Sequence, residues 1–229
     1  MVNNARTNFQ HDGLVFDHAE SEFKTLEEFL YTSAQNVVSE YSKTVEFHNR
    51  HQKDFPKAIL DDLYQDDYFD VYLEDLSKHG NTFPQLLLYS IMIIACSLFE
   101  SCMRLVCESM NHFNKTDLHW DELQGPVVHK IVRLLKAIGL RLEDEKEYIG
   151  KFENFYMVRN CIVHNNGSID NYRGKAKLLE YAKRMGIISD DDSEQALELK
   201  QSYCENVCET FESFFLHLSL DYQSKKKSA

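Results

Sequence analysis

The sequence predicts an all-α protein, a bundle of helices preceded by an N-terminal helical extension. Apolar residues recur every three or four positions along most of the chain, which is the spacing of one helix face. Only 3 Pro and 8 Gly interrupt 229 residues, and this scarcity favours long helices over many short strands. With 43% apolar and 27% charged residues, the chain has the composition of a globular protein that buries a core.

The N-terminal third, residues 1–80, is expected to be an acidic helical extension. Residues 1–18 show no period and are predicted to form a loose arm that is not a signal peptide. Helical spacing then runs through residues 23–45. A second helical segment, residues 59–76, carries an acidic face, and Gly80 is predicted to end it.

Residues 81–224 are expected to form the bundle. Its central element is a long helix from Thr82 to about Met110, with Pro84 tolerated in the first turn. Because this helix is apolar on most sides, we place it in the middle of the bundle. The last residues, 225–229, are expected to be a frayed basic tail. Further helices are predicted over residues 120–138, 143–167, 172–185 and 193–222.

The cellular setting is predicted from the apolar segments and the cysteines. The most apolar stretch, residues 86–99, stops at Glu100 and is too short to span a bilayer, so we expect no membrane contact. Six cysteines lie mostly inside apolar helical segments, and no two of them form a Cys-x-x-Cys pair. We therefore expect reduced core cysteines in a cytoplasmic protein.

The net charge of −12 is distributed unevenly. Residues 1–79 hold 7 Lys or Arg and 16 Asp or Glu, whereas residues 80–229 hold 18 and 21. Such a protein does not bind nucleic acid by bulk electrostatics, and we expect no DNA binding. A local basic groove is not excluded, although a solvated helix face is the favoured interpretation of each basic cluster. The two clusters are His129, Lys130, Arg133, Lys136 and Arg141, and Arg173, Lys175, Lys177, Lys183 and Arg184.

The segment with the clearest chemistry is residues 158–167, Val-Arg-Asn-Cys-Ile-Val-His-Asn-Asn-Gly. It places Arg159, Asn160 and His164 in an apolar helical run that ends in a helix-stop signal. Arg can clamp a phosphate and His can move a proton near neutral pH, and a phosphodiester-cleaving site needs both. The alternative is that Arg159 and His164 only tie down the C-terminus of the helix.

Residues 159–167 resemble the signature of the HEPN ribonucleases, in which an Arg, often followed by Asn, precedes a His by a few residues. Leu98-Phe99-Glu100 resembles the earlier family helix, which often carries an acidic residue facing the site. The resemblance is close over residues 152–170 and loose over residues 83–222. It implies an HEPN-like antiparallel helical bundle that dimerises through the motif helix. Its site is then composite, with Arg and His from both subunits.

The resemblance further implies a metal-independent endoribonuclease without a cofactor, acting in a toxin–antitoxin or antiviral defence system. RNA would be the substrate, since attack by its 2′-OH on the adjacent phosphorus leaves a 2′,3′-cyclic phosphate. His164 is expected to act as general base or acid, and Arg159 to bind the phosphate. Asn160 would orient His164 or a phosphate oxygen. Glu100 would orient Arg159 or His164, or form a buried ion pair with no part in the chemistry.

Two features depart from this pattern. Family toxins that are silenced by nucleotidyl transfer carry a Tyr two residues after the His, where this chain has Asn166. The net charge of −12 is also unfavourable for an RNA-binding protein, and it suggests a narrow substrate, a local groove or an acidic extension that restrains activity. An inhibitory or sensor partner is a further expectation. The second interpretation is a catalytically inactive, HEPN-like dimeric scaffold that binds a partner or nucleotide through the same groove.

Overall fold

The computed structural model describes residues 14–54, 71, 73–114, 117–140, 144–188 and 195–228. Within these ranges the chain is helical and has no strand, only two isolated β-bridges, Ser168 with Ala196 and Ile188 with Leu197. The predicted all-α class is therefore confirmed.

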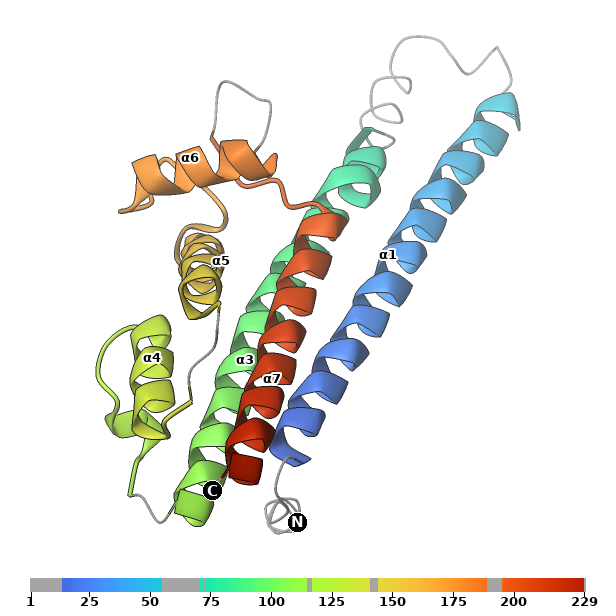
Figure 1. Ribbon diagram of the computed structural model, residues 1–229. Helices are drawn as coiled ribbons and strands as arrows, with labels where there is room; N and C mark the ends of the chain where they lie inside the picture. Colours follow the sequence, from blue (N-terminus) through green and yellow to red (C-terminus); the bar gives the residue numbers. More distant parts are fainter. Residues whose placement is uncertain are drawn as a thin grey trace.

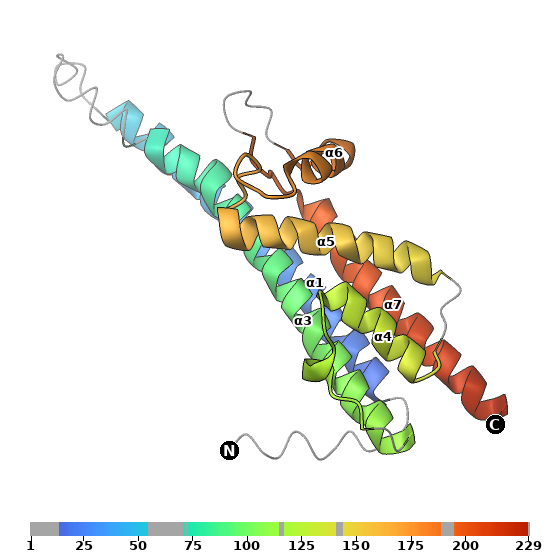
Figure 2. The same cartoon turned by 90° about the vertical axis from the view of Figure 1, so that its left-hand side faces the viewer.

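Three long helices lie side by side and form the body of the molecule (Figure 1). Helix α5 crosses α3 on the side away from α1, and α4 and α6 lie on that same side (Figure 2). The helices are α1 (Leu14–Asp54), α3 (Phe83–Asn114), α4 (Val127–Ala137), α5 (Glu145–Asn165), α6 (Lys175–Met185) and α7 (Gln201–Ser228), with short turns η1 (Lys78–Thr82) and η2 (Trp120–Glu122).

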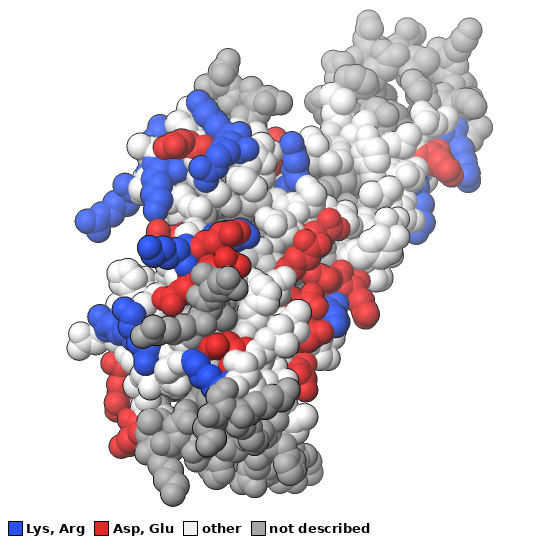
Figure 3. All heavy atoms as spheres, in the orientation of Figure 1, with Lys and Arg blue, Asp and Glu red and all other residues white. Residues whose placement is uncertain are grey.

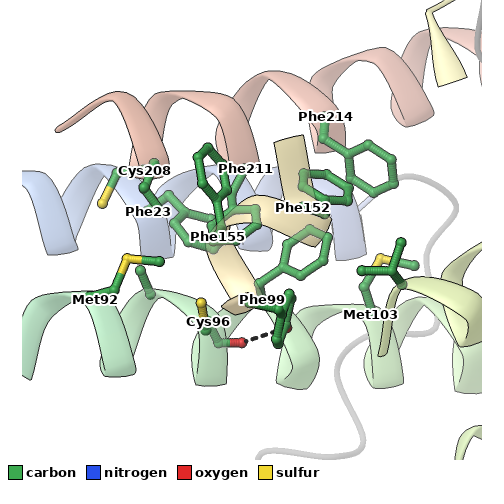
Figure 4. Packing of buried hydrophobic residues seen from close by; sticks show 14 of the residues in the cluster. Phe23, Met92, Cys96, Phe99, Met103, Phe152, Phe155, Cys208, Phe211 and Phe214 are labelled. Atoms are coloured by element: carbon green, nitrogen blue, oxygen red, sulfur yellow. Dashed lines mark hydrogen bonds between the residues drawn. The ribbon is translucent and has the colours of Figure 1, made fainter. Parts of the chain in front are cut away.

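A cluster of aromatic rings joins α3, α5 and α7 at the centre (Figure 4). Phe99 of α3 stacks on Phe211 of α7 with ring centroids 4.2 Å apart, and Phe152 of α5 approaches Phe99 to 4.8 Å. All three side chains are fully buried. Burial of a large aromatic side chain stabilises a fold by about 1.5–3 kcal/mol, so this cluster fixes where α5 crosses α3.

The first half of α1 belongs to the same core. Phe23 lies 5.5 Å from the Phe211 ring, and Phe16 lies 6.0 Å from the Tyr222 ring. The loose arm predicted through residue 18 is therefore wrong for residues 14–18, because burial of Val15 and Phe16 extends the helix to Leu14. The division of the chain at residue 80 stays a prediction.

Gly80 does not end a helix. A π-helical turn, Lys78–Thr82, connects residues 73–77 to α3 without interruption. Pro84 has no N–H to donate to a preceding carbonyl, and a π turn accommodates such a loss. An ideal Cβ on Gly80 would lie 3.1 Å from Cε2 of Tyr41, so this position is close to α1. Of the predicted segment 59–76, residues 59–70 and 72 lie outside the described residues.

Three other boundaries differ from the prediction. Gly125, with φ of +96°, and Pro126 divide the predicted helix 120–138 into η2 and α4. Residues 195–200 are extended, so α7 begins at Gln201; residue 193, its predicted start, lies outside the described residues. The predicted frayed tail is helical to Ser228, and Lys225 Nζ donates a hydrogen bond to the Gly139 carbonyl. A cation in the last helical turn also interacts favourably with the helix dipole.

One described helix, Leu73–Asn111, is long and apolar enough by length and composition to cross a membrane. The core helix of a soluble protein meets the same criterion. Here the helix buries Met92, Phe99 and Met103 against its neighbours (Figure 4).

Candidate functional site

Helix α5 carries the Arg-Asn-x-x-x-His motif in its last two turns. Glu145 and Glu147 lie in its first turn, where the helix dipole favours negative charge. Asn166 adopts the left-handed conformation with φ of +50°, its N–H bonds to the Cys161 carbonyl, and Gly167 follows with φ of +80°. The predicted stop at Asn-Asn-Gly is confirmed, since only residues that tolerate positive φ end a helix in this way.

The turn after His164 is held against α3 and against the segment that precedes α7. The Leu197 N–H donates to the Gly167 carbonyl at 2.8 Å, and the Tyr89 hydroxyl donates to the Leu197 carbonyl at 2.5 Å. An ideal Cβ on Gly167 would lie only 2.1 Å from that hydroxyl oxygen. Glycine is therefore required here for space as well as for φ, and the end of α5 has a fixed position.

Arg159 is half-buried on the side of α5 that faces α3. One guanidinium nitrogen, Nη1, donates to Oδ1 of the neighbouring Asn160 at 3.1 Å. Its Nε is buried and has no hydrogen-bond partner among the described residues. An unsatisfied buried donor costs about 1–3 kcal/mol, so this side chain is not placed for stability alone.

Glu100 of α3 faces the same region of α5. The buried Tyr156 hydroxyl donates to the Cys96 carbonyl at 3.2 Å. Burial raises the pKa of Tyr156, the Glu100 carboxylate raises it further, and the Arg159 guanidinium opposes both effects. The same two charges act in opposite directions on the Cys96 thiol, whose pKa is raised mainly by burial. Glu100 and Arg159 therefore both lie near the buried Tyr156 and Cys96 side chains, and no salt bridge joins the two charges.

His164 does not join this group within one chain. Five residues separate it from Arg159, a rotation of about 140° and a rise of about 7.5 Å along the helix. Its side chain is exposed and makes no hydrogen bond or ion pair with the described residues. The structure thus brings Arg159, Asn160 and Glu100 together but leaves His164 pointing elsewhere. Tyr156 is the residue that the sequence reasoning missed; its position three residues before Arg159 was the available signal.

Three exposed apolar side chains lie on α5 and on the part of α3 that α5 crosses. Val163, beside His164 in the chain, is 43% exposed, and Leu86 and Ile94 of α3 are 49% and 44% exposed. Around α3, Leu86 lies about 60° from Tyr89, which contacts the turn after α5. Ile94 lies about 160° from Cys96, which contacts α5, and therefore faces away from the motif. An apolar patch rimmed by polar side chains is typical of a protein–protein contact.

Three other kinds of candidate site are a metal centre, a reactive cysteine and a basic groove. The described residues contain no group of three or more His, Cys, Asp or Glu side chains placed to hold a metal ion. The six cysteines are free and buried, as expected, and burial raises the pKa of Cys161 to about 11, so its thiol is a poor nucleophile. Of the first basic cluster, Lys130 and Arg133 bind the backbone carbonyls of Trp120 and Gln124, and Arg141 lies outside the described residues.

No protein-family model matches the chain, and no significant match is found among curated proteins or among solved structures.

Proposed function

We propose that the protein is a metal-independent endoribonuclease of the HEPN type. The observation that carries the proposal is the half-buried Arg159, whose Nε has no partner and whose neighbours are Asn160 and Glu100. A guanidinium that is held in place with an unused donor is suited to bind a phosphate. The exposed His164, less than two turns away on the same rigid helix, supplies the proton transfer.

The site is composite, formed by two copies of the chain. Because Arg159 and His164 diverge on one helix, one chain does not direct both at the same phosphate. The exposed Leu86 and Val163 form the proposed contact between copies. Pairing of two α5 helices about a twofold axis places the partner's His164 near Arg159 and repeats the arrangement symmetrically.

The proposed reaction breaks one phosphodiester bond and needs no other reactant. The ribose 2′-oxygen loses its proton to a base and bonds to phosphorus, while the bond from phosphorus to the 5′-oxygen breaks and that oxygen takes up a proton. The products are a 2′,3′-cyclic phosphate and a 5′-hydroxyl. His164 transfers the proton as base or acid, and Arg159 offsets the charge that develops on the phosphate. Asn160 and Glu100 position these two groups.

The test is cleavage of total RNA and transfer RNA in the presence of EDTA. We expect 2′,3′-cyclic ends from the wild type and a loss of about 10²–10⁴-fold in rate for His164→Ala and for Arg159→Ala. His119→Ala is the matched control, because His119 is also exposed but lies beside Asp117 at the far end of α3. Absence of cleavage by a folded, dimeric wild type contradicts the proposal.

Dimerisation has a separate test. Leu86→Glu places a charge in the proposed contact and is expected to give monomers and to abolish cleavage, whereas Val38→Glu, at a 61% exposed position of α1, is expected to change neither. Sedimentation of both variants measures the oligomeric state. A monomeric wild type that still cleaves RNA contradicts the composite site.

The second candidate is an inactive dimeric scaffold that binds a protein partner or a nucleotide through the same groove. It is favoured by the net charge of −12, which opposes binding of RNA. The ribonuclease proposal also includes a toxin or antiviral role, a cytoplasmic location and an inhibitory or sensor partner. An active toxin is expected to be harder to express than its His164→Ala variant, and equal expression favours the scaffold.

A further inference from the structure

Two opposite charges are half-buried where α3 and α5 cross, away from the charged outer surface. On the face shown in Figure 3, Lys and Arg gather over α6, whereas Asp and Glu gather where α7 and α1 lie side by side. Water screens exposed charges of this kind. Glu100 of α3 and Arg159 of α5 are each half-buried. Because opposite charges attract more strongly there than in water, the two side chains would be expected to pair.

Both side chains lean toward one contact between the helices. The Tyr156 hydroxyl of α5 donates a hydrogen bond to the Cys96 carbonyl of α3 at 3.2 Å. Helical side chains lean toward the N-terminus of their helix, so Glu100 lies over the turn that contains Cys96. For the same reason Arg159 lies over the turn that contains Tyr156. Yet no salt bridge joins the two charges, and the buried Arg159 Nε has no hydrogen-bond partner among the described residues.

The Tyr156 hydroxyl lies at the point toward which both charged side chains lean. Besides the Cys96 carbonyl, the Glu100 carboxylate is a second, weaker hydrogen-bond partner of this hydroxyl. Burial is the largest cause that raises the pKa of Tyr156, and the charge of Glu100 and its hydrogen bond raise it further. The hydroxyl therefore keeps its proton near neutral pH and remains a donor to the carboxylate.

We infer that Tyr156 is a positioning residue, whose hydroxyl holds the Glu100 carboxylate away from Arg159 and so leaves the guanidinium free to bind a phosphate. This inference rests on the proposed function and adds to it the control of the Arg159 charge. A carboxylate bonded to Arg159 would occupy the same donors that a phosphate needs, so the separation of the two charges is a condition of substrate binding.

The first test is nuclear magnetic resonance of the full-length Tyr156→Phe protein, which keeps the ring and loses the hydroxyl. Loss of a signal in Arg159→Lys identifies the Nε–H of Arg159. In Tyr156→Phe we expect Glu100 to turn to Arg159, because nothing else holds its carboxylate. The Nε–H signal should then shift, and its exchange with solvent should slow at least about tenfold.

The second test is whether the effect of Tyr156→Phe requires the carboxylate. In the RNA-cleavage assay, Tyr156→Phe is expected to raise KM about tenfold, because Glu100 then competes with the phosphate for Arg159. Tyr156→Phe/Glu100→Gln is expected to match Glu100→Gln alone, both in KM and in the exchange of the Nε–H. If Tyr156→Phe has the same effect in both backgrounds, the hydroxyl serves only the fold and the inference is overturned.

The matched control is Tyr203→Phe, which removes another buried hydroxyl. Tyr203 of α7 is hydrogen-bonded to the Tyr181 hydroxyl at 3.3 Å, and no carboxylate is among the groups that raise its pKa. It is expected to leave the Arg159 signal and KM unchanged. Equal changes in Tyr203→Phe and Tyr156→Phe would indicate a general loosening of the core, and they contradict a specific role of Tyr156.

The magnetic resonance measurement does not depend on cleavage, so it separates this inference from the proposed function. An Arg159 signal that responds to Tyr156→Phe only when Glu100 is present, in a protein that cleaves no RNA, sustains the positioning role and removes the ribonuclease. Cleavage by the wild type, with the Arg159 signal and KM unchanged in Tyr156→Phe, sustains the ribonuclease and removes the positioning role.

Discussion

At the scale of single residues, positions that are unfavourable for stability surround the motif. The Arg159 Nε is buried without a partner, and Asn166 has a φ of +50°. Gly167 leaves no room for a side chain beneath the Tyr89 hydroxyl. Such features persist only where the surrounding structure enforces them, and they are concentrated at functional sites.

Replacement of Arg159 separates a structural from a functional role. Arg159→Met keeps the length and the apolar stem but removes the guanidinium. Because the Nε is unsatisfied, we expect the free energy of unfolding to stay within about 1 kcal/mol of wild type or to rise, while cleavage is lost. Urea unfolding and the cleavage assay measure the two quantities. A loss of stability beyond about 2 kcal/mol would show that Arg159 serves the fold.

A comparison of Gly167 with Gly139 separates the free-energy cost of a positive φ from the cost of a steric clash. Gly139 has a φ of +73° with no atom within 4 Å of an ideal Cβ, so Gly139→Ala reports the cost of the backbone conformation, about 1–2 kcal/mol. Gly167→Ala adds the clash with Tyr89, and we expect it to cost at least about 1 kcal/mol more than the control. Equal losses in urea unfolding would mean that the contact with Tyr89 is absent in solution.

At the scale of elements, the contact between α1 and α7 combines a buried apolar seam with an acidic edge. Glu27 of α1 faces Glu205, Glu209 and Glu212 of α7. Burial raises the pKa of Glu27, and the three carboxylates raise it further, against the smaller effect of Lys24. Lys24 bridges Glu20 and Glu212, at 2.5 Å and 3.5 Å, and offsets part of this repulsion.

The raised pKa of Glu27 has a defined consequence for stability. A carboxyl group whose pKa is higher in the folded state destabilises the fold when ionised, and this cost disappears as the pH falls through the folded pKa. Glu27→Gln is therefore expected to stabilise the protein at pH 7 by less than about 1 kcal/mol, because water screens a half-buried carboxylate. The gain should shrink in acid and at high salt.

Thermal unfolding over a pH series measures this effect, with Glu28→Gln as the control at the adjacent exposed position. A gain that is the same for both variants, or that does not decrease in acid, would contradict the assignment to Glu27.

At the scale of the whole molecule, the first helix and the bundle share one core. Phe23 is fully buried against Phe211 and Phe215, whereas Phe29, less than two turns away, is 51% exposed. Deletion of residues 1–80 is therefore a poor test of whether the extension restrains activity. It also removes the apolar side chains of α1 that pack against α3 and α7, and so exposes the core. Charge changes on the outer face of α1 leave the core intact and are the better probe.

The shared core predicts one cooperative unfolding transition. Phe23→Ala is expected to lower the free energy of unfolding by about 3–5 kcal/mol, and Phe29→Ala by less than about 1 kcal/mol. Circular dichroism of helices and fluorescence of Trp120, which lies beside α3 and α4, should report the same midpoint in urea. Two separate transitions would instead support an independent extension.

What the sequence by itself determined is local or periodic. The apolar spacing sets the helical class, Asn166 and Gly167 end α5, and the motif residues identify a candidate site, because each signal depends on neighbours within one or two turns. The starts of helices were harder to predict from the sequence. Residues 14–18 are helical because Phe16 packs on Tyr222, which lies near the other end of the chain.

Only the tertiary structure decided which residues meet. Glu100 and Tyr156 come together because Phe99 and Phe152 pack where α3 and α5 cross, and Lys200 joins α6 through a backbone pairing between distant segments. It also showed that Arg159 is half-buried whereas His164 is exposed. Contacts between residues far apart in sequence depend on how whole helix faces fit and exclude water, and no local pattern encodes that fit.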